Sequence, residues 1–353
     1  MKGLILSGGH GVRLRPLTFS QQKQLIPIAN RPILFYCIQD LIDAGIREIA
    51  IIVGPNREQV IETVQAFPWD ATITFIEQDA PRGLAHAVKI ARGFLGDEKF
   101  IMYLGDNLLK GGSAYFVRDF GASDLDASLL LTEVEDPTQY GVALVDEQKK
   151  VIVRLVEKPK KPPSNLSIVG IYGLSPRIFE AIDQIKPSWR GELEITDALH
   201  WLIENGYQVG YRMVEGWWKD TGKPEDILEA NRLILEGMQS SVLGTVEKSV
   251  IKGEVVVGAG SCIRSGSVLR GPVIVGKDCI IEGSSIGPFT SIGDNAVIID
   301  SAVEDSIVME GSRICHAGKI VQSLIGKNVV VESDPGHPSD RQFILGDSSQ
   351  VRL

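Results

Sequence analysis

Glycines and cationic side chains are concentrated just behind the first apolar segment of the chain. The run K-G-L-I-L at 2–6 is too short for a helix and predicts a buried strand. It is followed by Gly8, Gly9 and Gly11, whose missing Cβ atoms let backbone N–H groups approach a ligand closely. Three cationic side chains come next: Arg13, Arg15 and Lys23. A bare backbone beside cations is suited to binding a polyphosphate.

Two well-known phosphate-binding motifs do not fit this loop. The pattern G-x-x-x-x-G-K-[ST] is absent, and the dinucleotide fingerprint requires a third glycine where Leu14 stands. Pro16 also argues against a helix that begins directly after the loop. A tight turn with two exposed arginines is the alternative for a glycine cluster alone. The full pattern G-G-x-G-x-R-L-x-P-L-T followed by K-Q-L-x-P is much rarer than its parts, and it favours the phosphate site.

The overall composition is that of an ordinary globular protein. The 353 residues suffice for two domains, and 44% hydrophobic with 23% charged residues is typical. The formal charge of −9 argues against non-specific binding to nucleic acid or to anionic membranes. We expect neither a signal peptide nor a membrane-spanning segment, because the apolar runs are too short. Four cysteines lie far apart without a C-x-x-C pair, so we expect buried free thiols in a reducing cytoplasm: Cys37, Cys262, Cys279 and Cys315.

Helical and strand patterns alternate in the first third of the chain. Apolar spacing between Pro32 and Gly45 predicts a helix there. Strands are predicted at 48–53, 72–77 and 100–104, with helices around 60–64 and at about 83–95. This alternation predicts a parallel, doubly wound sheet, whose ligands bind beyond the carboxyl ends of the strands. From 127 onward the pattern becomes strand-rich.

Polar residues follow several of these predicted strands. Gln78 comes after the third strand, and Asp106 stands in L-G-D-N directly after the fourth. A carboxylate at that position, beside a polyphosphate site, is well placed to hold Mg²⁺, which prefers oxygen ligands. The alternative is a turn or helix cap, since Asp and Asn favour both. Asp220 precedes the helix that we expect to begin at Pro224, and it is either a turn residue or a second metal carboxylate.

Glu157 and Lys158 end one of the strands in the second part of the sheet. A glutamate can accept hydrogen bonds from sugar hydroxyls, and a neighbouring lysine can meet a phosphate as a point charge. A pair of exposed charges on an edge strand, which protects against aggregation, is the alternative. On these two residues alone the edge-strand interpretation is preferred.

Beyond about residue 240 the helical period disappears, and aliphatic residues recur in steps of six with glycine after several of them. The series is Val257, Ile263, Leu269, Val275 and Ile281, then, after a slip of one, Ile286, Ile292 and Ile298, continuing through Val308, Ile314 and Ile320. This period predicts a parallel β-helix of three hexapeptides per coil, in which each aliphatic stacks on the corresponding one in the next coil. Many left-handed coils of this kind are acyltransferases, and His316 would be the candidate base, but no obvious coenzyme-binding motif accompanies it. We interpret the coil as a scaffold or an oligomerisation surface.

Further motifs extend over nearly the whole chain: K-Q-L-I-P, G-L-A-H-A, L-G-D-N, Y-G-V, E-K-P, P-S-N, R-G-E-L-E-I-T-D and W-W-K-D-T-G-K-P-E-D. With the glycine loop, they resemble the sugar-1-phosphate nucleotidyltransferases, and among them the long-form glucose-1-phosphate thymidylyltransferases. The resemblance implies an α/β, doubly wound Rossmann-like catalytic domain at 1–238 and a left-handed β-helix at 239–353. Val12 stands where that family usually has Thr, and we expect activity to survive because the phosphate cradle is mainly backbone.

The resemblance also implies a reaction. Glucose 1-phosphate would attack the α-phosphorus of dTTP in line, with Mg²⁺ as cofactor, giving dTDP-glucose and pyrophosphate. Arg13 and Lys23 would be catalytic, Asp106 and Asp220 would hold the metal, and the thymine edge would be read by Gln78 and the backbone at Gly83. The implied nucleotide-binding set is Leu6, Gly8, Gly9, Gly11, Arg13, Gln78, Gly83 and Asp106. The implied sugar-phosphate set is Tyr140, Gly141, Glu157, Lys158 and Val169.

Other functions stay open on the sequence alone. An enzyme that uses UTP or another sugar phosphate would have much the same sequence, because a pocket for the thymine methyl group leaves little trace. A non-catalytic nucleotide-sugar sensor of the same fold is a second alternative, although Arg13, Lys23, Asp106 and Asp220 are all present. A bifunctional enzyme with an acyltransferase coil is a third. We expect a homo-oligomer with small-molecule substrates and with neither nucleic acid nor membrane as a partner.

Overall fold

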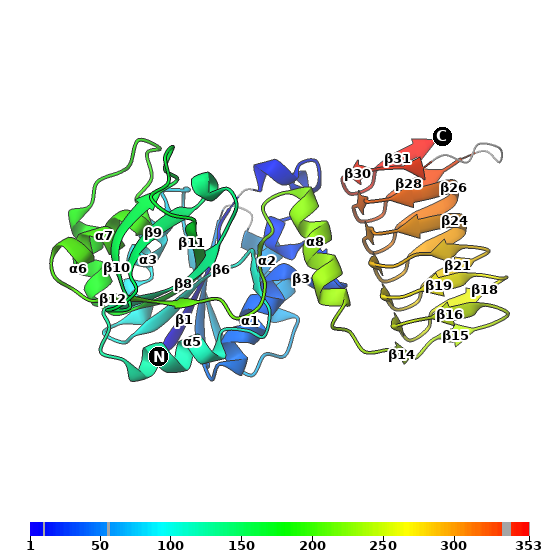
Figure 1. Ribbon diagram of the computed structural model, residues 1–353. Coiled ribbons are helices and arrows are strands. Elements are labelled where there is room, and N and C mark those ends of the chain that lie inside the picture. The colour runs from blue at the N-terminus through cyan, green and yellow to red at the C-terminus, as the bar shows by residue number, and fades with distance from the viewer. Residues whose placement is uncertain (10, 55–56, 334–339, 353) are drawn as a thin grey trace. The chain divides into compact units, whose positions relative to one another are not determined.

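The computed structural model describes residues 1–9, 11–54, 57–333 and 340–352 (Figure 1). Its contacts divide the chain into two compact units. Unit 1 contains Met1–His10 and Leu34–Asp220, and unit 2 contains Gly11–Ile33 and Thr221–Leu353. The segment Gly11–Ile33 therefore groups with the C-terminal part of the chain. The domain boundary between 238 and 239 stays a prediction, because a grouping by contacts does not define where a domain ends in the sequence.

Unit 1 is built on a nine-stranded sheet in the order β5-β4-β1-β6-β11-β8-β12-β10-β9. The strands are β1 (Lys2–Ser7), β4 (Glu48–Val53), β5 (Thr72–Glu77), β6 (Phe100–Leu104), β8 (Ala127–Glu133), β9 (Gly141–Asp146), β10 (Val151–Glu157), β11 (Leu166–Leu174) and β12 (Val209–Met213). The four strands of this sheet that come first in the sequence pair in parallel, as predicted: β1 with β4 and β6, and β4 with β5. The remaining half is mixed, because β11 runs antiparallel to both β6 and β8.

Helices cover both faces of this sheet. The helices are α1 (Ile33–Asp43), α2 (Arg57–Gln65), α3 (Leu84–Ile90), α4 (Arg92–Leu95), α5 (Ala114–Ala122), α6 (Arg177–Gln184) and α7 (Ile195–Glu204). Apolar residues of α3, α4, α6 and α7 share one buried cluster with Leu4 and Tyr172 of the sheet. Neighbouring strand positions point the other way, so a Cβ on Gly3 would lie 2.9 Å from Leu41 of α1. The doubly wound arrangement is therefore confirmed.

The helix expected over 83–95 is interrupted in the structure. It consists of α3 and α4, which meet at Ala91. There the N–H of Ala91 donates to the carbonyl of Val88 at 3.1 Å, which is the tighter 3₁₀ pattern. Gly93, with its low helix propensity, lies in the short second helix. The apolar pattern continues through the junction, so the sequence did not reveal the break.

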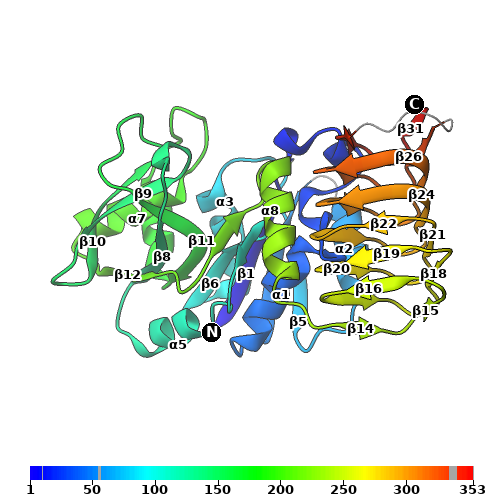
Figure 2. The same ribbon diagram turned by 45° about the vertical axis from the view of Figure 1, so that its right-hand side comes forward.

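Short parallel strands stack as successive coils in the C-terminal part of unit 2 (Figure 2). They are β14 (Ser241–Val242), β15 (Thr245–Val246), β16 (Val250–Lys252), β17 (Val255–Val257), β18 (Cys262–Arg264), β19 (Val268–Arg270), β20 (Val273–Val275), β21 (Ile280–Glu282), β22 (Ser285–Ile286), β23 (Thr290–Ile292), β24 (Val297–Glu304), β25 (Ile307–Val308), β26 (Arg313–Val321), β27 (Leu324–Ile325), β28 (Val330–Glu332), β29 (Asp340–Arg341), β30 (Ile344–Leu345) and β31 (Gln350–Arg352). This is the predicted left-handed parallel β-helix.

The coil length changes along the β-helix. Val257 pairs with Val275, which is the predicted step of three hexapeptides. The middle coils are shorter: Leu269 pairs with Ile286, one position short of that step, and the pairing of β23 with β25 is shorter by one more. The last described coil is longer, since Leu324 pairs with Ile344. The turns lose residues while the aliphatic ladder stays continuous, and the ladder forms a single buried cluster. The shortening by one agrees with the slip of one in the aliphatic series before Ile286, whereas the further changes of coil length were not predicted.

Unit 2 also contains the segment that carries the predicted phosphate-binding cations. It forms three short 3₁₀ turns, η1 (Val12–Leu14), η2 (Leu17–Phe19) and η3 (Lys23–Leu25), and a hairpin of β2 (Pro27–Ile28) with β3 (Arg31–Pro32). The helix α8 (Pro224–Leu235) belongs to the same unit and has Pro224 in its first turn, as expected.

All four cysteines are free. Cys37, Cys279 and Cys315 are buried as expected, whereas Cys262 is partly exposed. Among the described residues, no helix is both long enough and apolar enough to cross a lipid bilayer.

The aliphatic ladder yields a stability prediction with a built-in control. Ile281 is fully buried in the coil, whereas its neighbour Ile280 is 37% exposed. We expect Ile281→Ala to lower the free energy of unfolding by about 2–5 kcal/mol, because it leaves a cavity. Ile280→Ala should cost about 1 kcal/mol or less. Urea unfolding of the two full-length variants measures both values, and equal losses would contradict the assignment of Ile281 to the ladder.

Candidate active site

Two glycine-containing loops approach each other at the carboxyl ends of β1 and β4. A Cβ added to Gly54 would lie 2.9 Å from the carbonyl oxygen of Gly8. A Cβ on Gly8 would lie 3.5 Å from Oε1 of Gln78. Gly9 follows and is exposed. Leu6, by contrast, is buried in the sheet, and its carbonyl accepts the N–H of Gly105 at 3.0 Å. The loop therefore presents backbone, whereas the Leu6 side chain belongs to the core.

Hydrogen bonds of its backbone and of its side chain hold Gln78 at the end of β5. Its backbone N–H donates to the carbonyl of Val53 at 2.9 Å, and its Nε2 lies 3.3 Å from the carbonyl of Gly83 and 3.0 Å from Nδ1 of His86. Burial lowers the pKa of His86, and the nearby Arg82 lowers it further. A neutral imidazole can accept from the Gln78 amide, which fixes the orientation of that amide.

Gly83 requires its missing side chain. Its φ of 98° lies in the left-handed region, and a Cβ there would run into the backbone of Leu193. The carbonyl of Leu193 in turn accepts a hydrogen bond from the N–H of Ala85 at 3.1 Å. The N–H of Leu193 donates to the carbonyl of Arg82 at 2.8 Å. The predicted pair Gln78 and Gly83 is thus brought together and supported by the segment before α7.

The segments of the two candidate metal carboxylates are joined by a pair of three-residue strands. Asp106 follows β6 and precedes β7 (Asn107–Leu109), which pairs antiparallel with β13 (Trp218–Asp220). In this register Asp220 lies opposite Asn107. Nδ2 of Asn107 donates to Oδ1 of Asp106 at 2.8 Å, and its Oδ1 accepts from Nε1 of Trp218 at 2.6 Å. Asn107 thus links the two strands beside both carboxylates.

No group of three or more His, Cys, Asp or Glu side chains converges within the described ranges in a way that could hold a metal ion. The predicted cation ligands are the pair Asp106 and Asp220, which is smaller than such a group. Two carboxylates suit Mg²⁺, which usually keeps water and substrate phosphates as its other ligands.

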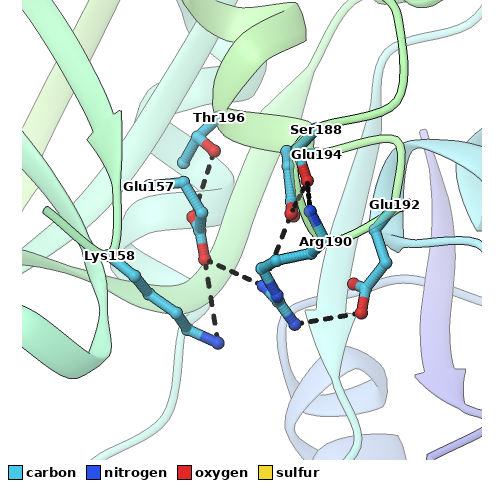
Figure 3. A network of polar contacts seen from close by, with 7 residues as sticks. All are labelled: Glu157, Lys158, Ser188, Arg190, Glu192, Glu194 and Thr196. Atoms are coloured by element: carbon cyan, nitrogen blue, oxygen red, sulfur yellow. Dashed lines mark hydrogen bonds and ion pairs between the residues drawn. The ribbon is translucent and has the colours of Figure 1, made fainter.

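Glu157 stands at the centre of a charged network in unit 1 (Figure 3). Its Oε2 accepts from Oγ1 of Thr196 at 3.0 Å. Its Oε1 lies 3.9 Å from Nζ of Lys158 and 3.8 Å from Nη1 of Arg190. Burial raises the pKa of Glu157, and the neighbouring Glu194 raises it further. The edge-strand interpretation of Glu157 therefore fails, because this side chain points into a network and not into solvent.

Arg190 connects Glu157 to two further carboxylates. Its Nη1 lies 3.4 Å from Oε1 of Glu194 and its Nη2 lies 3.0 Å from Oε1 of Glu192 (Figure 3). Oγ of Ser188 also donates to Glu194, at 2.9 Å. A single guanidinium thus holds three acidic side chains from two separate segments in one place.

The backbone next to Glu157 is fixed by the segment around Tyr140. Lys158 is exposed, has a φ of 41°, and donates its N–H to the carbonyl of Tyr140 at 3.0 Å. Gly141 lies opposite Glu157 in the β9–β10 ladder, and a Cβ there would lie 2.9 Å from Cγ2 of Thr196. The ring of Tyr140 meets Trp218 edge-on, with 5.4 Å between centroids. Four members of the predicted sugar-phosphate set are thus neighbours.

The fifth member, Val169, lies in a break of the sheet. The ladder between β11 and β8 shifts register between Ile168 and Tyr172, and the Val169 side chain is fully buried. Next to it, a Cβ on Gly170 would lie 2.9 Å from Cγ of Asn107. Any role of Val169 toward a ligand therefore falls to its backbone.

Gly11, Arg13 and Lys23 lie in unit 2, on the segment Gly11–Ile33. Gly11 has a φ of 60°, and a Cβ on it would lie 2.8 Å from Cβ of Lys23. Oγ1 of Thr18 donates to the carbonyl of Gly11 at 2.8 Å. Lys23 is buried, whereas Arg13 is exposed. The structure therefore brings Gly11 and Lys23 into contact within this unit.

Sequence reasoning missed several residues of these networks. Arg190, Glu194 and Thr196 belong to R-G-E-L-E-I-T-D, one of the motifs that carry the resemblance, but none of the three was assigned a role from the sequence. Asn107 and Trp218 also lie in quoted motifs but had no assigned role. The available signal was the concentration of charged residues in R-G-E-L-E-I-T-D, although Glu157, the partner of these residues, is far away in the sequence.

The chain is similar in sequence to known nucleotidyltransferases. The sequence profile of the nucleotidyl transferase family matches residues 2–237. A glucose-1-phosphate thymidylyltransferase from Streptomyces antibioticus is 46% identical over 100% of this chain and 99% of its own length. The low-salt glycan biosynthesis nucleotidyltransferase Agl11 from Haloferax volcanii is 46% identical over 100% of both chains.

Two solved structures are also similar to this chain. One is a Bacillus anthracis protein assigned as a glucose-1-phosphate thymidylyltransferase, in complex with sucrose. It has a TM-score of 0.62 and 33% identity, over 68% of this chain and 97% of that chain. UDP-glucose pyrophosphorylase complexed with UDP-glucose has a TM-score of 0.60 and 26% identity, over 67% and 99%.

The family profile and the full-length relatives define the class of this protein as a nucleotidyltransferase. The chain belongs to the nucleotidyl transferase family, and it is an enzyme that acts on sugar 1-phosphates.

The raised pKa of Glu157 predicts a pH dependence of stability. Between the ordinary carboxyl pKa of about 4.3 and the raised value, the folded state binds more protons than the unfolded state, so stability falls as pH rises through that window. Glu157→Gln removes this titration. Urea unfolding from about pH 4 to 7 should therefore show wild type losing stability relative to Glu157→Gln with rising pH. A difference between the two proteins that is constant with pH would contradict the raised pKa.

Proposed function

We propose that this nucleotidyltransferase transfers the thymidylyl group of dTTP to glucose 1-phosphate and releases pyrophosphate. The observation that carries the proposal is the link made by Trp218, which donates to Asn107 beside Asp106 and packs edge-on against Tyr140. The carbonyl of Tyr140 accepts the N–H of Lys158. One side chain thus connects the acidic pair with the proposed sugar-phosphate segment. Full-length relatives named glucose-1-phosphate thymidylyltransferase support these substrates.

The acidic pair fits Mg²⁺. Asp106 and Asp220 offer carboxylate oxygens from neighbouring strands, and the hydrogen bond from Asn107 orients Asp106. When bound there, Mg²⁺ would neutralise phosphate charge and polarise the α-phosphoryl group. The carboxylates would hold the ion, and the backbone of Gly8 and Gly9 would approach the nucleotide.

The remaining steps need only positioning and charge. A phosphate monoester has a second pKa of about 6, so the attacking oxygen of the sugar phosphate is already ionised and needs no general base. Lys158 would bind that phosphate and Glu157 would accept sugar hydroxyls. Arg13 and Lys23 would stabilise charge on the α-phosphorus as pyrophosphate leaves. Gln78 and the backbone at Gly83 would read the base.

The domain boundaries and the oligomeric state are proposed from the same resemblance. We place the catalytic domain at 1–238 and the β-helix at 239–353, in a homo-oligomer. The four free cysteines support work in a reducing compartment such as the cytoplasm.

Two comparisons favour a second candidate, a related enzyme with another nucleotide or sugar phosphate. Agl11 matches this chain as well as the thymidylyltransferases do, and its name states glycan biosynthesis without a nucleotide. A UDP-glucose pyrophosphorylase shares the fold at 26% identity. The acidic pair and the sugar-phosphate segment would serve these reactions equally well.

Pyrophosphate release separates the two candidates. We expect dTTP to be used fastest when dTTP, UTP, ATP, CTP and GTP are compared with Mg²⁺ and glucose 1-phosphate. Asp106→Asn should lower kcat at least about 100-fold, because losing a metal ligand costs about 3 kcal/mol or more of transition-state stabilisation. Asp70→Asn, which changes an exposed carboxylate, should leave kcat unchanged.

Each other outcome has a definite meaning. A different preferred nucleotide would keep the mechanism and overturn the thymine assignment. No turnover with any nucleotide or sugar phosphate would favour the non-catalytic sensor.

A further inference from the structure

One buried amide in unit 2 joins three separate stretches of the chain. Asn231 of α8 is fully buried. Its Oδ1 accepts from the N–H of Ala29 at 2.9 Å and from Oγ of Ser291 at 2.7 Å. Its Nδ2 donates to the carbonyl of Phe289 at 3.0 Å. A buried amide with both its polar atoms used fixes the relative position of the groups that it joins.

The first of these stretches is the hairpin β2–β3. Its two turn residues, Ala29 and Asn30, have φ values of 47° and 60°, which is the pattern of a type I′ turn. A left-handed alanine is unfavourable by itself and needs support from its surroundings. That support comes from Asn231 at the N–H of Ala29 and from a hydrogen bond of Asn30 Nδ2 to the carbonyl of Ile292, at 2.6 Å.

The hairpin continues directly from the turn that carries Lys23. The N–H of Ile33 donates to the carbonyl of Ile26 at 3.2 Å, and the N–H of Ile26 donates to the carbonyl of Lys23 at the same distance. The Cβ of Lys23 contacts Gly11, as described above. A path of direct contacts therefore leads from Asn231 through the hairpin to Lys23.

The other partners of Asn231 belong to the β-helix. Phe289 and Ser291 lie at the turn into and within β23, and Ile292 is part of the aliphatic ladder. The same helix is tied to the coil a second time, by a two-bond ion pair between Arg232 and Asp305. Nearer the start of the segment Gly11–Ile33, Oγ of Ser20 donates to Oδ2 of Asp347 at 2.9 Å.

We propose that the β-helix positions the phosphate-binding segment of this enzyme, with Asn231 and Ser291 as positioning residues for Lys23. The coil would then contribute to the chemical step, in addition to any role as scaffold or oligomerisation surface. The proposal rests on the function proposed above for Lys23.

The test compares two buried coil serines in the full-length protein. Ser291→Ala removes the hydroxyl that bonds Asn231, whereas Ser261→Ala removes an equally buried hydroxyl that bonds Gly276 and Cys279. With the nucleotide that wild type uses best, we expect Ser291→Ala to lower kcat and kcat/KM for that nucleotide between about 10-fold and 100-fold. KM for the sugar phosphate should stay unchanged, since its proposed ligands are in unit 1. Ser261→Ala should have wild-type constants.

A second variant addresses the amide itself. Asn231→Asp keeps two acceptor bonds but sets a carboxylate oxygen against the carbonyl of Phe289, so its kcat should fall more than that of Ser291→Ala. Circular dichroism establishes that each variant is folded.

The outcomes separate this proposal from the one on which it rests. Turnover in wild type with no difference between Ser291→Ala and Ser261→Ala overturns the positioning role alone. An equal rise of KM for nucleotide and sugar phosphate would also overturn it, because a general loss of structure would then be the cause. Absence of turnover in wild type overturns both proposals together.

Discussion

The structure of the candidate site depends on the pairing of two very short strands, β7 and β13. Each has three residues, and one side-chain bond between them, from Trp218 to Asn107, spans 111 positions of sequence. The pairing sets Asp220 opposite Asn107, next to Asp106. Gly170 completes the arrangement, because a Cβ there would push against Asn107. The short strand pair thereby links the segment of Asp106 to that of Asp220, the two residues proposed as metal ligands.

The charged network around Glu157 likewise brings together residues from distant parts of the sequence. Glu157 is buried enough to have a raised pKa, yet it is surrounded by Lys158, Arg190 and Thr196. Arg190 holds the network together because its planar guanidinium meets several carboxylates at once. Gly141 lets β9 lie close to this cluster. Under the proposed function, these hydrogen-bonding groups would already be arranged to contact a sugar phosphate.

Much of the fold could be predicted because its signals are local. Apolar runs mark the parallel strands, and a step of six marks the β-helix. The interruption at Ala91 left no such signal, because the apolar pattern continues through it. The slip of one before Ile286 did signal a shorter coil, but the further changes of coil length lie in turns and do not interrupt the aliphatic ladder. Asp106 could be singled out by its place behind a buried strand.

The rest of the site depends on contacts between distant segments. Nothing in the sequence pattern alone pairs Asp220 with Asn107, because a three-residue strand has no measurable period. The resemblance to a family assigned Asp106 and Asp220 to the metal but did not predict this strand pairing. The partners of Glu157 were missed for the same reason, since Arg190 and Thr196 follow it by more than thirty positions. The linking role of Asn231 could not be predicted, because in the sequence a buried asparagine cannot be distinguished from an exposed polar residue of an amphipathic helix.

The central claim is that Asp106 and Asp220 act together on one metal ion. The most direct measurement is the rate of pyrophosphate release as a function of free Mg²⁺ concentration, in wild type and in Asp220→Asn. The account predicts that Asp220→Asn needs a much higher Mg²⁺ concentration for half-maximal rate and recovers part of its rate as Mg²⁺ is raised. An unchanged half-saturating concentration with a lower maximal rate would contradict it, because Asp220 would then support the fold of β13 without holding the ion.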